Sequence, residues 1–185
     1  MMQGTNIALT EYREQDGLDF TMWQWDPALM SGLAEDIYHP FQVKDWEALF
    51  ADTQSNENFA FVIRRQADDQ AVGFITLSDV KVKNRNGELG LAIYDPESRG
   101  KGYAKEALQL MLAFCFDHIG LHKVRLSVHG FNRSAIALYE KVGFILEGTN
   151  RESIFHEGQW YPQYDYGLLQ KEWRTLKEGN YEANS

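Results

Sequence analysis

Short runs in which apolar and polar residues alternate predict the first elements of the chain. The pattern predicts a strand over Asn6–Tyr12, after which the aromatic-rich stretch Leu18–Trp25 has an ambiguous period. Two short helices are expected next, and the clearer one covers Val43–Asp52. Its apolar residues recur at helical spacing, at Trp46, Leu49 and Phe50.

Two longer runs of β-forming residues predict a hairpin. Asn58–Arg65 and Ala71–Leu77 are rich in aromatic and β-branched residues, and the polar sequence QADDQ separates them. A third run, Glu88–Tyr94, follows the turn-forming pair Asn86-Gly87. The three runs together predict an antiparallel meander.

The clearest periodicity predicts an amphipathic helix that begins near Ala104 and ends at Gly120. A strand is then predicted over Lys123–His129. Because a helix joins this strand to Glu88–Tyr94, the two strands should run parallel. The apolar face of the helix contains Ala104, Ala107, Leu108, Met111, Leu112, Cys115 and Ile119.

The last third of the chain predicts one more helix and short strands. The helix covers Ser134–Val142, and the strands cover Phe144–Glu147 and Tyr164–Leu169. Parallel and antiparallel strands combined with helices indicate an α+β fold with a mixed sheet. No linker or repeat interrupts residues 1–176, so we expect them to form a single domain. Residues 177–185 are polar and are expected to form a flexible tail.

Composition places the chain among globular proteins and excludes some classes of function. Its 185 residues are 44% hydrophobic and 24% charged, as in average globular domains. A formal net charge of −9 argues against nucleic-acid binding, which needs clustered lysine and arginine. The N-terminal sequence lacks the features of a secretion signal, and no apolar run is long enough to span a membrane. We therefore expect a cytoplasmic protein without a membrane partner.

The histidines and the single cysteine do not form a metal-binding or nucleophile pattern. His118 and His122 are four residues apart, but Gly120 between them breaks the helix. Cys115 lies on the apolar helix face, where a free cysteine usually packs as a small hydrophobic residue. We therefore expect neither a metal site nor a cysteine nucleophile.

A glycine-bearing loop joins the predicted strand Glu88–Tyr94 to the long helix. From Arg99 to Ala104 it reads RGKGYA. A helix N-terminus exposes unpaired N–H groups at the positive end of its dipole, and glycine lets a phosphate approach them closely. The loop matches neither the P-loop nor the dinucleotide-binding pattern. Its spacing alone leaves two interpretations open, a cradle for a diphosphate or simply a tight turn.

Two motifs in this order resemble the GNAT superfamily of N-acetyltransferases. The sequence R-x-x-G-x-A from Arg99 is similar to that superfamily's acyl-CoA-binding signature, and N-x-x-A-x-x-L-Y-E-K-V-G-F from Asn132 is similar to its later motif. The resemblance extends from Asn58 to Leu169 and is greatest to spermidine acetyltransferases and to enzymes that acetylate ribosomal-protein N-termini. It implies a GNAT-like fold: a mixed twisted sheet of about six or seven strands, about four flanking helices, and a central strand, glycine loop and helix.

The resemblance implies acetyl-CoA as the donor and assigns the residues that would hold it. The end of the strand would pair with the pantetheine arm, which requires Glu88–Tyr94 and Lys123–His129 to separate at their ends. Amides of the glycine loop would bind the diphosphate, with Arg99 and Lys101 adding positive charge. Asn132 would lie beside the pantetheine or simply cap the following helix. The implied cofactor residues are Ala92, Ile93, Tyr94, Arg99, Gly100, Lys101, Gly102, Tyr103, Ala104 and Asn132.

The resemblance also implies direct attack of an amine on the thioester. Tyr139 matches the residue that donates a proton to the departing thiolate, and a core tyrosine is the alternative. A backbone N–H near Ile93 would polarise the acetyl carbonyl. Glu88 is the candidate base that removes the amine proton through water, and a surface glutamate, with water as the base, is the alternative.

Acids are concentrated near the N-terminus, with seven between Glu11 and Asp36 against one base, Arg13. In GNAT relatives this region borders the acceptor, so the acids would attract a cationic amine; a solvated acidic face is the alternative. Three functions stay open: acetylation of a polyamine or other small amine, acetylation of a protein N-terminus such as that of a ribosomal protein, and a non-catalytic acyl-CoA-binding module. A homo-oligomer stays open too. The acids are Glu11, Glu14, Asp16, Asp19, Asp26, Glu35 and Asp36.

Overall fold

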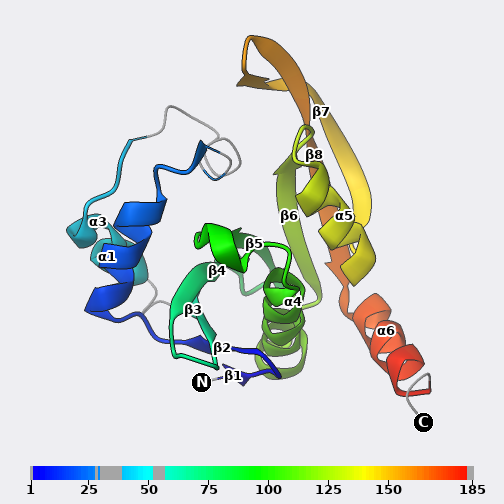
Figure 1. The fold of residues 1–185 in the computed structure, drawn as a ribbon. Coiled ribbons are helices and arrows are strands. Elements are labelled where there is room, and N and C mark those ends of the chain that lie inside the picture. The colour runs from blue at the N-terminus through cyan, green and yellow to red at the C-terminus, as the bar shows by residue number, and fades with distance from the viewer. Residues whose placement is uncertain (1, 28, 30–38, 52–56, 183–185) are drawn as a thin grey trace. The chain divides into compact units, whose positions relative to one another are not determined.

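The computed structural model describes residues 2–27, 29, 39–51 and 57–182 (Figure 1). The chain forms two compact units. The first comprises Met1–Val80 and Leu89–Met111, and the second comprises Lys81–Glu88 and Leu112–Ser185. Strand β5, Asn86–Ile93, contributes its first residues to the second unit and the others to the first.

An antiparallel meander forms the sheet of the first unit, as the sequence predicts. Its strands are β1 (Met2–Gln3), β2 (Ile7–Thr10), β3 (Phe59–Arg65), β4 (Ala71–Lys81) and the later part of β5. β2 pairs with β3 and β3 with β4, and β5 is the next neighbour of β4. The pairing of Phe59 with Leu77 and of Val62 with Phe74 confirms the predicted hairpin.

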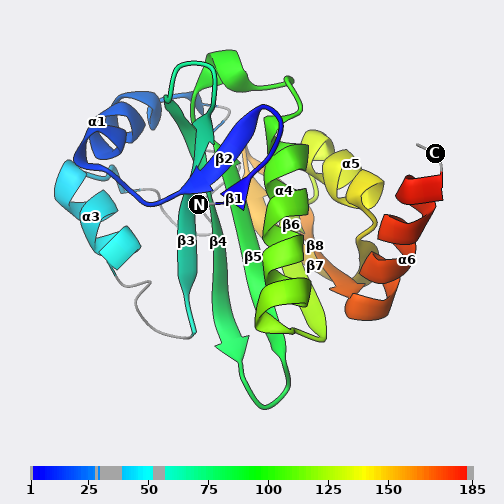
Figure 2. The same cartoon turned by 90° about the horizontal axis from the view of Figure 1, so that it is seen from below.

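Helices α1 (Glu14–Trp23) and α3 (Val43–Ala51) lie side by side next to β3 (Figure 2). Their aromatic side chains fill the core of this unit. The ring centroids of Phe20 and Trp46 lie 5.4 Å apart, and Trp46 contacts Tyr94 edge-on at 5.3 Å. Such edge-on pairs favour a defined geometry. They hold the helices against the residue at which β5 leads into the glycine loop.

A buried ion pair attaches the start of α1 to the sheet. Arg64 Nη2 lies 2.7 Å from Asp16 Oδ2, and the two side chains are 5% and 2% exposed. The guanidinium also donates to Thr10 Oγ1 at 3.2 Å and to the carbonyl of Asp69 at 2.9 Å. The same Asp16 oxygen accepts the N–H of Arg13 at 2.8 Å, at the helix N-terminus. These hydrogen bonds offset the cost of removing two charges from water.

The second unit is built around strand β6. Its elements are a π-helical turn (Phe114–Ile119), β6 (Lys123–His129), α5 (Arg133–Val142), β7 (Ile145–His156), β8 (Gln159–Leu169) and α6 (Gln170–Glu182). β8 lies between β6 and β7 and is antiparallel to both. β6 runs parallel to the start of β5, from the pair Asn86 and Lys123 to the pair Glu88 and Arg125. This confirms the predicted parallel order.

Two glycines end the helices where the sequence predicts. Helix α4 (Tyr103–Ala113) continues into the π-helical turn and stops at Gly120, whose φ is 78°. Helix α5 stops at Gly143, whose φ is 111°. Both values are in the left-handed region, which glycine adopts without a steric penalty.

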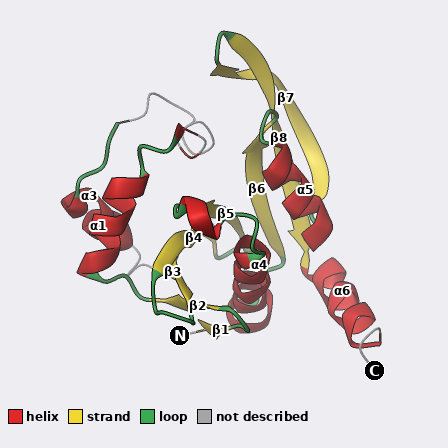
Figure 3. Cartoon of the chain, viewed as in Figure 1, coloured by secondary structure: helices red, strands yellow, loops and turns green. Residues whose placement is uncertain are grey.

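The β7–β8 hairpin is longer than the sequence analysis predicts (Figure 3). The expected strands Phe144–Glu147 and Tyr164–Leu169 are only its base, and the turn at the tip contains Gly158 with φ 78°. The prediction was wrong because most of β7 is exposed and polar and therefore lacks a hydrophobic alternation. A bulge between Asn150 and Ile154 interrupts the period further.

Other expectations are also corrected. Asn86-Gly87 lies within β5 rather than in a turn, and the preceding turn contains Arg85 with φ 50°. The expected tail from Lys177 is helical as far as Glu182. The described residues form eight strands, against about six or seven expected, and no pattern indicates the two-residue β1. Among these residues no helix is both long and apolar enough to cross a membrane.

We expect Asp16→Asn to lower the free energy of unfolding by about 3–5 kcal/mol, because it leaves the buried guanidinium of Arg64 without its counter-charge. Asparagine keeps the size of the side chain and an oxygen for the helix cap. Urea unfolding followed by circular dichroism measures the change. Glu147→Gln is the matched control, since Glu147 pairs with Lys123 at 2.5 Å but is 41% exposed. Its loss should cost less than about 1 kcal/mol, and equal losses in both variants would contradict the prediction.

Candidate functional site

The end of β5 is held against β4 in a fixed geometry. The amides of Tyr94 and Asp95 both donate to the carbonyl of Val72, at 2.9 and 3.1 Å. Gly73 allows a close approach of the two strands, since a Cβ there would lie 2.1 Å from the carbonyl oxygen of Ala92. A side chain at position 73 would therefore force the end of β5 to move.

This geometry distinguishes the three residues expected to pair with a pantetheine arm. Tyr94 donates its N–H to Val72, and its carbonyl accepts Arg99 Nη2 at 3.4 Å, so both backbone groups are engaged within the protein. Ala92 directs its carbonyl towards Gly73 on β4. Because successive backbone groups of a strand point to opposite edges, the N–H of Ile93 points away from β4. Of these three residues, Ile93 thus has the backbone N–H that best fits the expected pairing with a pantetheine arm, which stays a prediction.

A short 3-10 turn, Pro96–Ser98, connects β5 to the glycine loop and is braced from β3. Asp95 Oδ1 accepts the N–H of Glu97 at 3.0 Å, and Ser98 Oγ donates to Asp95 Oδ2 at 2.5 Å. Arg65 Nη1 donates to Ser98 Oγ at 3.0 Å, while the rest of its guanidinium forms two bonds to Asp68. The Asp68 carboxylate raises the pKa of Arg65 above its usual range. This brace was missed by sequence reasoning, although aspartate before proline is a signal for a helical cap.

The glycine loop is open, and its backbone requires glycine. Gly100 and Gly102 have φ values of 72° and 84°, and no atom lies within 4 Å of where a Cβ would be. The first helical hydrogen bond of α4 runs from the N–H of Glu106 to the carbonyl of Gly102, at 3.1 Å. The amides between them, including those of Tyr103 and Ala104, therefore have no acceptor within the helix. An anion fits this arrangement of free amides at the positive end of a helix dipole.

The two cations of the loop have different surroundings. Arg99 points back towards the strand: Nε donates to the carbonyl of Ile93 at 3.3 Å, and Nη1 lies 2.9 Å from Asp26 Oδ1. Lys101 is exposed and forms no ion pair with any described residue. Of the two charges expected near a diphosphate, only that of Lys101 is therefore uncompensated.

Tyr139 lies in the second unit, on α5. It is 7% exposed, and its ring packs edge-on against Phe144 with the centroids 6.0 Å apart. Burial raises its pKa to about 12, and its hydroxyl bonds to no group in the described part of the chain. The phenol is thus protonated at neutral pH and has a proton to donate.

Asn132 is the N-cap of α5. Its Oδ1 accepts the N–H of Ala135 at 3.1 Å and the hydroxyl of Ser134 at 3.0 Å. One of the two alternatives for this residue, the helix cap, is therefore confirmed. Its Nδ2 donates to no described residue and remains available to a ligand.

Glu88 pairs with Arg125, its neighbour on β6, with 3.3 Å between Oε2 and Nη1. The two side chains are 40% and 38% exposed. Glu88 is therefore neither a buried carboxyl group nor a solitary surface acid. A base at this position would act from within an ion pair, with access to water.

Several of the N-terminal acids have partners within the protein. Asp16 pairs with Arg64, Asp26 pairs with Arg99, and Glu11 lies 3.7 Å from Arg13. Glu35 and Asp36 lie outside the described residues. The negative charge left to attract a distant cation is thus smaller than the sequence suggests.

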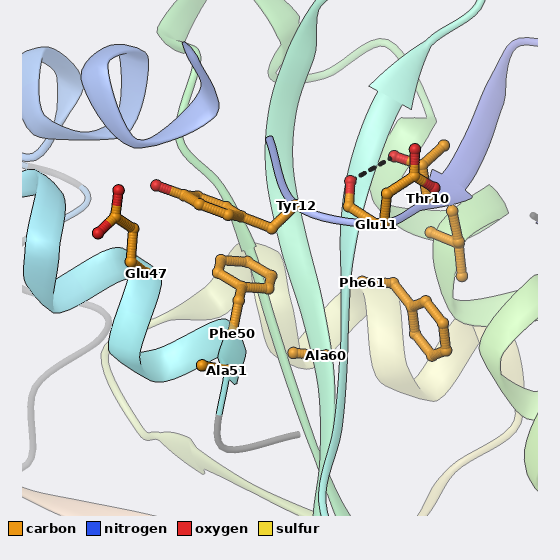
Figure 4. Close-up of a pocket in the computed structure, with 9 residues that line it drawn as sticks. Thr10, Glu11, Tyr12, Glu47, Phe50, Ala51, Ala60 and Phe61 are labelled. Atoms are coloured by element: carbon orange, nitrogen blue, oxygen red, sulfur yellow. Dashed lines mark hydrogen bonds between the residues drawn. The ribbon is translucent and has the colours of Figure 1, made fainter. Parts of the chain in front are cut away.

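A pocket of about 500 Å³ lies between the end of β2, strand β3 and helix α3 (Figure 4). Tyr12 and Phe50 stack in its wall with ring centroids 4.8 Å apart, and two carboxylates, those of Glu11 and Glu47, also line it. Burial and then the charge of Glu47 raise the pKa of Tyr12. None of the residues predicted to act on the donor or in catalysis lines this pocket.

Cysteine and metal chemistry find no support in the described residues. Cys115 is fully buried, and desolvation raises its pKa to about 12, so its thiol is not a nucleophile at neutral pH. No group of three or more His, Cys, Asp or Glu residues in these parts of the chain is arranged to bind a metal ion.

Comparison with known proteins is consistent with this geometry. Residues 6–145 match the acetyltransferase (GNAT) domain family. The chain is 30% identical over 169 residues to YokL, an uncharacterized N-acetyltransferase of Bacillus subtilis, covering 91% of this chain and 93% of that protein. It is 29% identical over 151 residues to the spermidine N(1)-acetyltransferase of Vibrio cholerae, covering 81% and 85%.

The fold also matches solved structures. A crystal structure of spermidine N-acetyltransferase from Vibrio cholerae in complex with CoA and spermine superposes with a TM-score of 0.79. The match covers 92% of this chain and 99% of that one, at 24% identity. At this identity the likeness shows a shared fold.

Proposed function

The chain belongs to the GNAT acetyltransferase family and is an acetyl-CoA-dependent N-acetyltransferase, and we propose that its acceptor is a polyamine or another small amine. The proposed reaction is direct attack of a neutral primary amine on the thioester in a ternary complex. The observation that carries the donor half is the open glycine loop with amides at the start of α4 that have no acceptor within the helix. The name of the Vibrio cholerae relative supports the acceptor half.

The residues of the first unit fit a donor with a diphosphate and an extended arm. The free amides from Gly100 to Ala104 would bind the diphosphate oxygens, and the exposed Lys101 would add the charge that Arg99 does not supply. The N–H of Ile93, which points away from β4, would donate to the acetyl carbonyl. Bound acetyl-CoA supplies the thioester. The remaining steps need only an oxyanion donor, a base and an acid.

The residues of the second unit fit the proton transfers. As the C–N bond forms, the amine loses a proton to Glu88 or to water at its carboxylate. As the C–S bond breaks, the thiolate takes the proton of the Tyr139 hydroxyl, and the phenolate regains a proton from water before the next turnover. The raised pKa of Tyr139, about 12, keeps that proton in place at neutral pH. Asn132 would donate a hydrogen bond from its Nδ2 to the pantetheine arm, while its Oδ1 caps α5.

A thiol-release assay with acetyl-CoA tests the proposed function. The acceptor panel contains spermidine and spermine, aminosugars, and peptides with free N-termini. Turnover with the polyamines and little with peptides is expected. Turnover with ribosomal-protein N-terminal peptides alone would show that the acceptor is a protein N-terminus and not a small amine. CoA binding without turnover on any amine would identify a non-catalytic module. Failure of CoA to raise the melting temperature would contradict the donor site.

Gly102→Ala should weaken CoA binding by about tenfold, because alanine is strained by about 1 kcal/mol at a φ of 84° and the loop would shift to relieve it. Gly120→Ala is the matched control, since Gly120 has a similar φ, 78°, and equally open surroundings at the other end of the helix. Isothermal titration with CoA gives the affinities and thermal unfolding gives the stabilities. Both variants should lose similar stability, and equal affinity losses would count against the loop as the donor site.

Tyr139→Phe should lower kcat by about a hundredfold or more with little change in KM, since it removes only the proton donor. In the wild type, burial keeps the pKa of Tyr139 near 12, so its ionisation should not lower kcat below about pH 10. Steady-state kinetics between pH 6 and 10 measure both effects. A decrease in wild-type kcat above pH 8 that is absent from Tyr139→Phe would show that the phenol ionises too early to fit this role.

Glu88→Gln should remove the acidic limb of the pH profile of kcat/KM if the carboxylate accepts the amine proton. Arg125→Gln is the control, because it breaks the ion pair and keeps the carboxylate. The limb should persist in Arg125→Gln, even if its midpoint moves. An unchanged profile for Glu88→Gln would exclude Glu88 and leave water as the base.

A further inference from the structure

The side chain of Arg99 joins two segments of the first unit that are far apart in sequence. Nε donates to the carbonyl of Ile93 at 3.3 Å, and Nη2 donates to the carbonyl of Tyr94 at 3.4 Å. Nη1 lies 2.9 Å from Oδ1 of Asp26, just after α1. The resemblance to GNAT enzymes assigns this arginine to the diphosphate, but all three of its nitrogens bond elsewhere.

With these bonds, two consecutive peptide groups are each hydrogen-bonded through both their C=O and their N–H. In the first group, the Ile93 carbonyl accepts from Arg99 and the Tyr94 N–H donates to Val72 at 2.9 Å. In the second, the Tyr94 carbonyl accepts from Arg99 and the Asp95 N–H donates to Val72 at 3.1 Å. Each plane is held at both ends, so neither can rotate without losing a hydrogen bond. The planar guanidinium fork suits such a paired contact, which an ammonium group cannot reproduce.

Asp26 determines the direction of the guanidinium. Its Oδ1 also accepts the N–H of Leu29 at 3.0 Å, and its own N–H donates to the carbonyl of Trp23 at 3.1 Å, so the carboxylate is held at the end of α1. The side chains of Arg99 and Asp26 are 32% and 24% exposed, which makes their pairing stronger than that of a fully solvated pair. With this anion in place, the cation stays against the strand end.

We propose that Arg99 and Asp26 are positioning residues for acetyl transfer. Together they fix the end of β5 so that the N–H of Ile93, which immediately precedes the two fixed peptide groups, is aligned with the acetyl carbonyl. Arg99 is not a ligand of the diphosphate. This inference rests on the proposed function for its catalytic consequence, whereas the fixing of the strand end is a property of the free protein.

The decisive variants are Asp26→Asn and Arg99→Lys. Asp26→Asn removes the anion that holds the guanidinium, and Arg99→Lys keeps the charge but removes the fork. Each should lower kcat roughly tenfold to a hundredfold, because small displacements of aligned groups slow reactions by such factors. The Kd of CoA should stay within about twofold, since no phosphate contact is lost. The double variant should lose little more than either single one, because the two residues act through one contact.

Amide hydrogen exchange tests the same inference without turnover. The amides of Tyr94 and Asp95 should exchange about tenfold faster in both variants of the free protein, because their peptide planes are then held at one end only. Asp117→Asn is the matched control: Asp117 pairs with Lys177 at 3.0 Å and is 45% exposed. It should change neither exchange at Tyr94 and Asp95 nor kcat.

The outcomes separate this inference from the proposed function. A wild type that exchanges slowly at Tyr94 and Asp95 but acetylates no amine would overturn the function and keep the fixing of the strand end. Unchanged exchange and kcat in both variants would overturn the inference. A phosphate ligand would give a different pattern, in which Asp26→Asn frees the guanidinium and tightens CoA binding while Arg99→Ala weakens it more than tenfold. That pattern would overturn it as well.

Discussion

A single carbonyl, that of Val72, accepts two successive amides of the chain that leaves β5. A regular antiparallel ladder gives each carbonyl one amide, so this double acceptance ends the strand and turns the chain. The turn is possible because position 73 has no side chain to collide with Ala92. The 3-10 turn, the glycine loop and the start of α4 all follow from the direction that the chain takes here.

The turn is rigid because charged side chains hold it from two directions. Arg65 reaches Ser98 from β3, and Arg99 reaches back to the carbonyls at the end of β5. Each arginine is itself fixed by an aspartate, Asp68 or Asp26. Two of the chain's acids are therefore used to orient cations inside one unit. Each such pair is neutral, so the external field comes from the acids in excess, which make up the net charge of −9.

Local periodicity predicted the elements that lead to the site, because each buries one face. The hairpin β3–β4, the helix that ends at Gly120 and the parallel order of β5 and β6 are all confirmed. The outer part of the β7–β8 hairpin was missed because β7 is largely exposed and bulged there. The direction of Arg99 was beyond prediction, since its partner Asp26 lies 73 positions away in the sequence.

The residues of one sequence motif can therefore serve different structural purposes. In the R-x-x-G-x-A segment, Gly102 supplies a left-handed backbone and the amides before Glu106 supply donors, while Arg99 serves the strand before the loop. Compensation of a diphosphate would then depend on Lys101 and on the helix dipole, which amounts to about half a charge. The donor would accordingly be held chiefly by directed hydrogen bonds from a rigid backbone. The end of β5 and the glycine loop would both have to be held in place, because one donor molecule would bind to both at once.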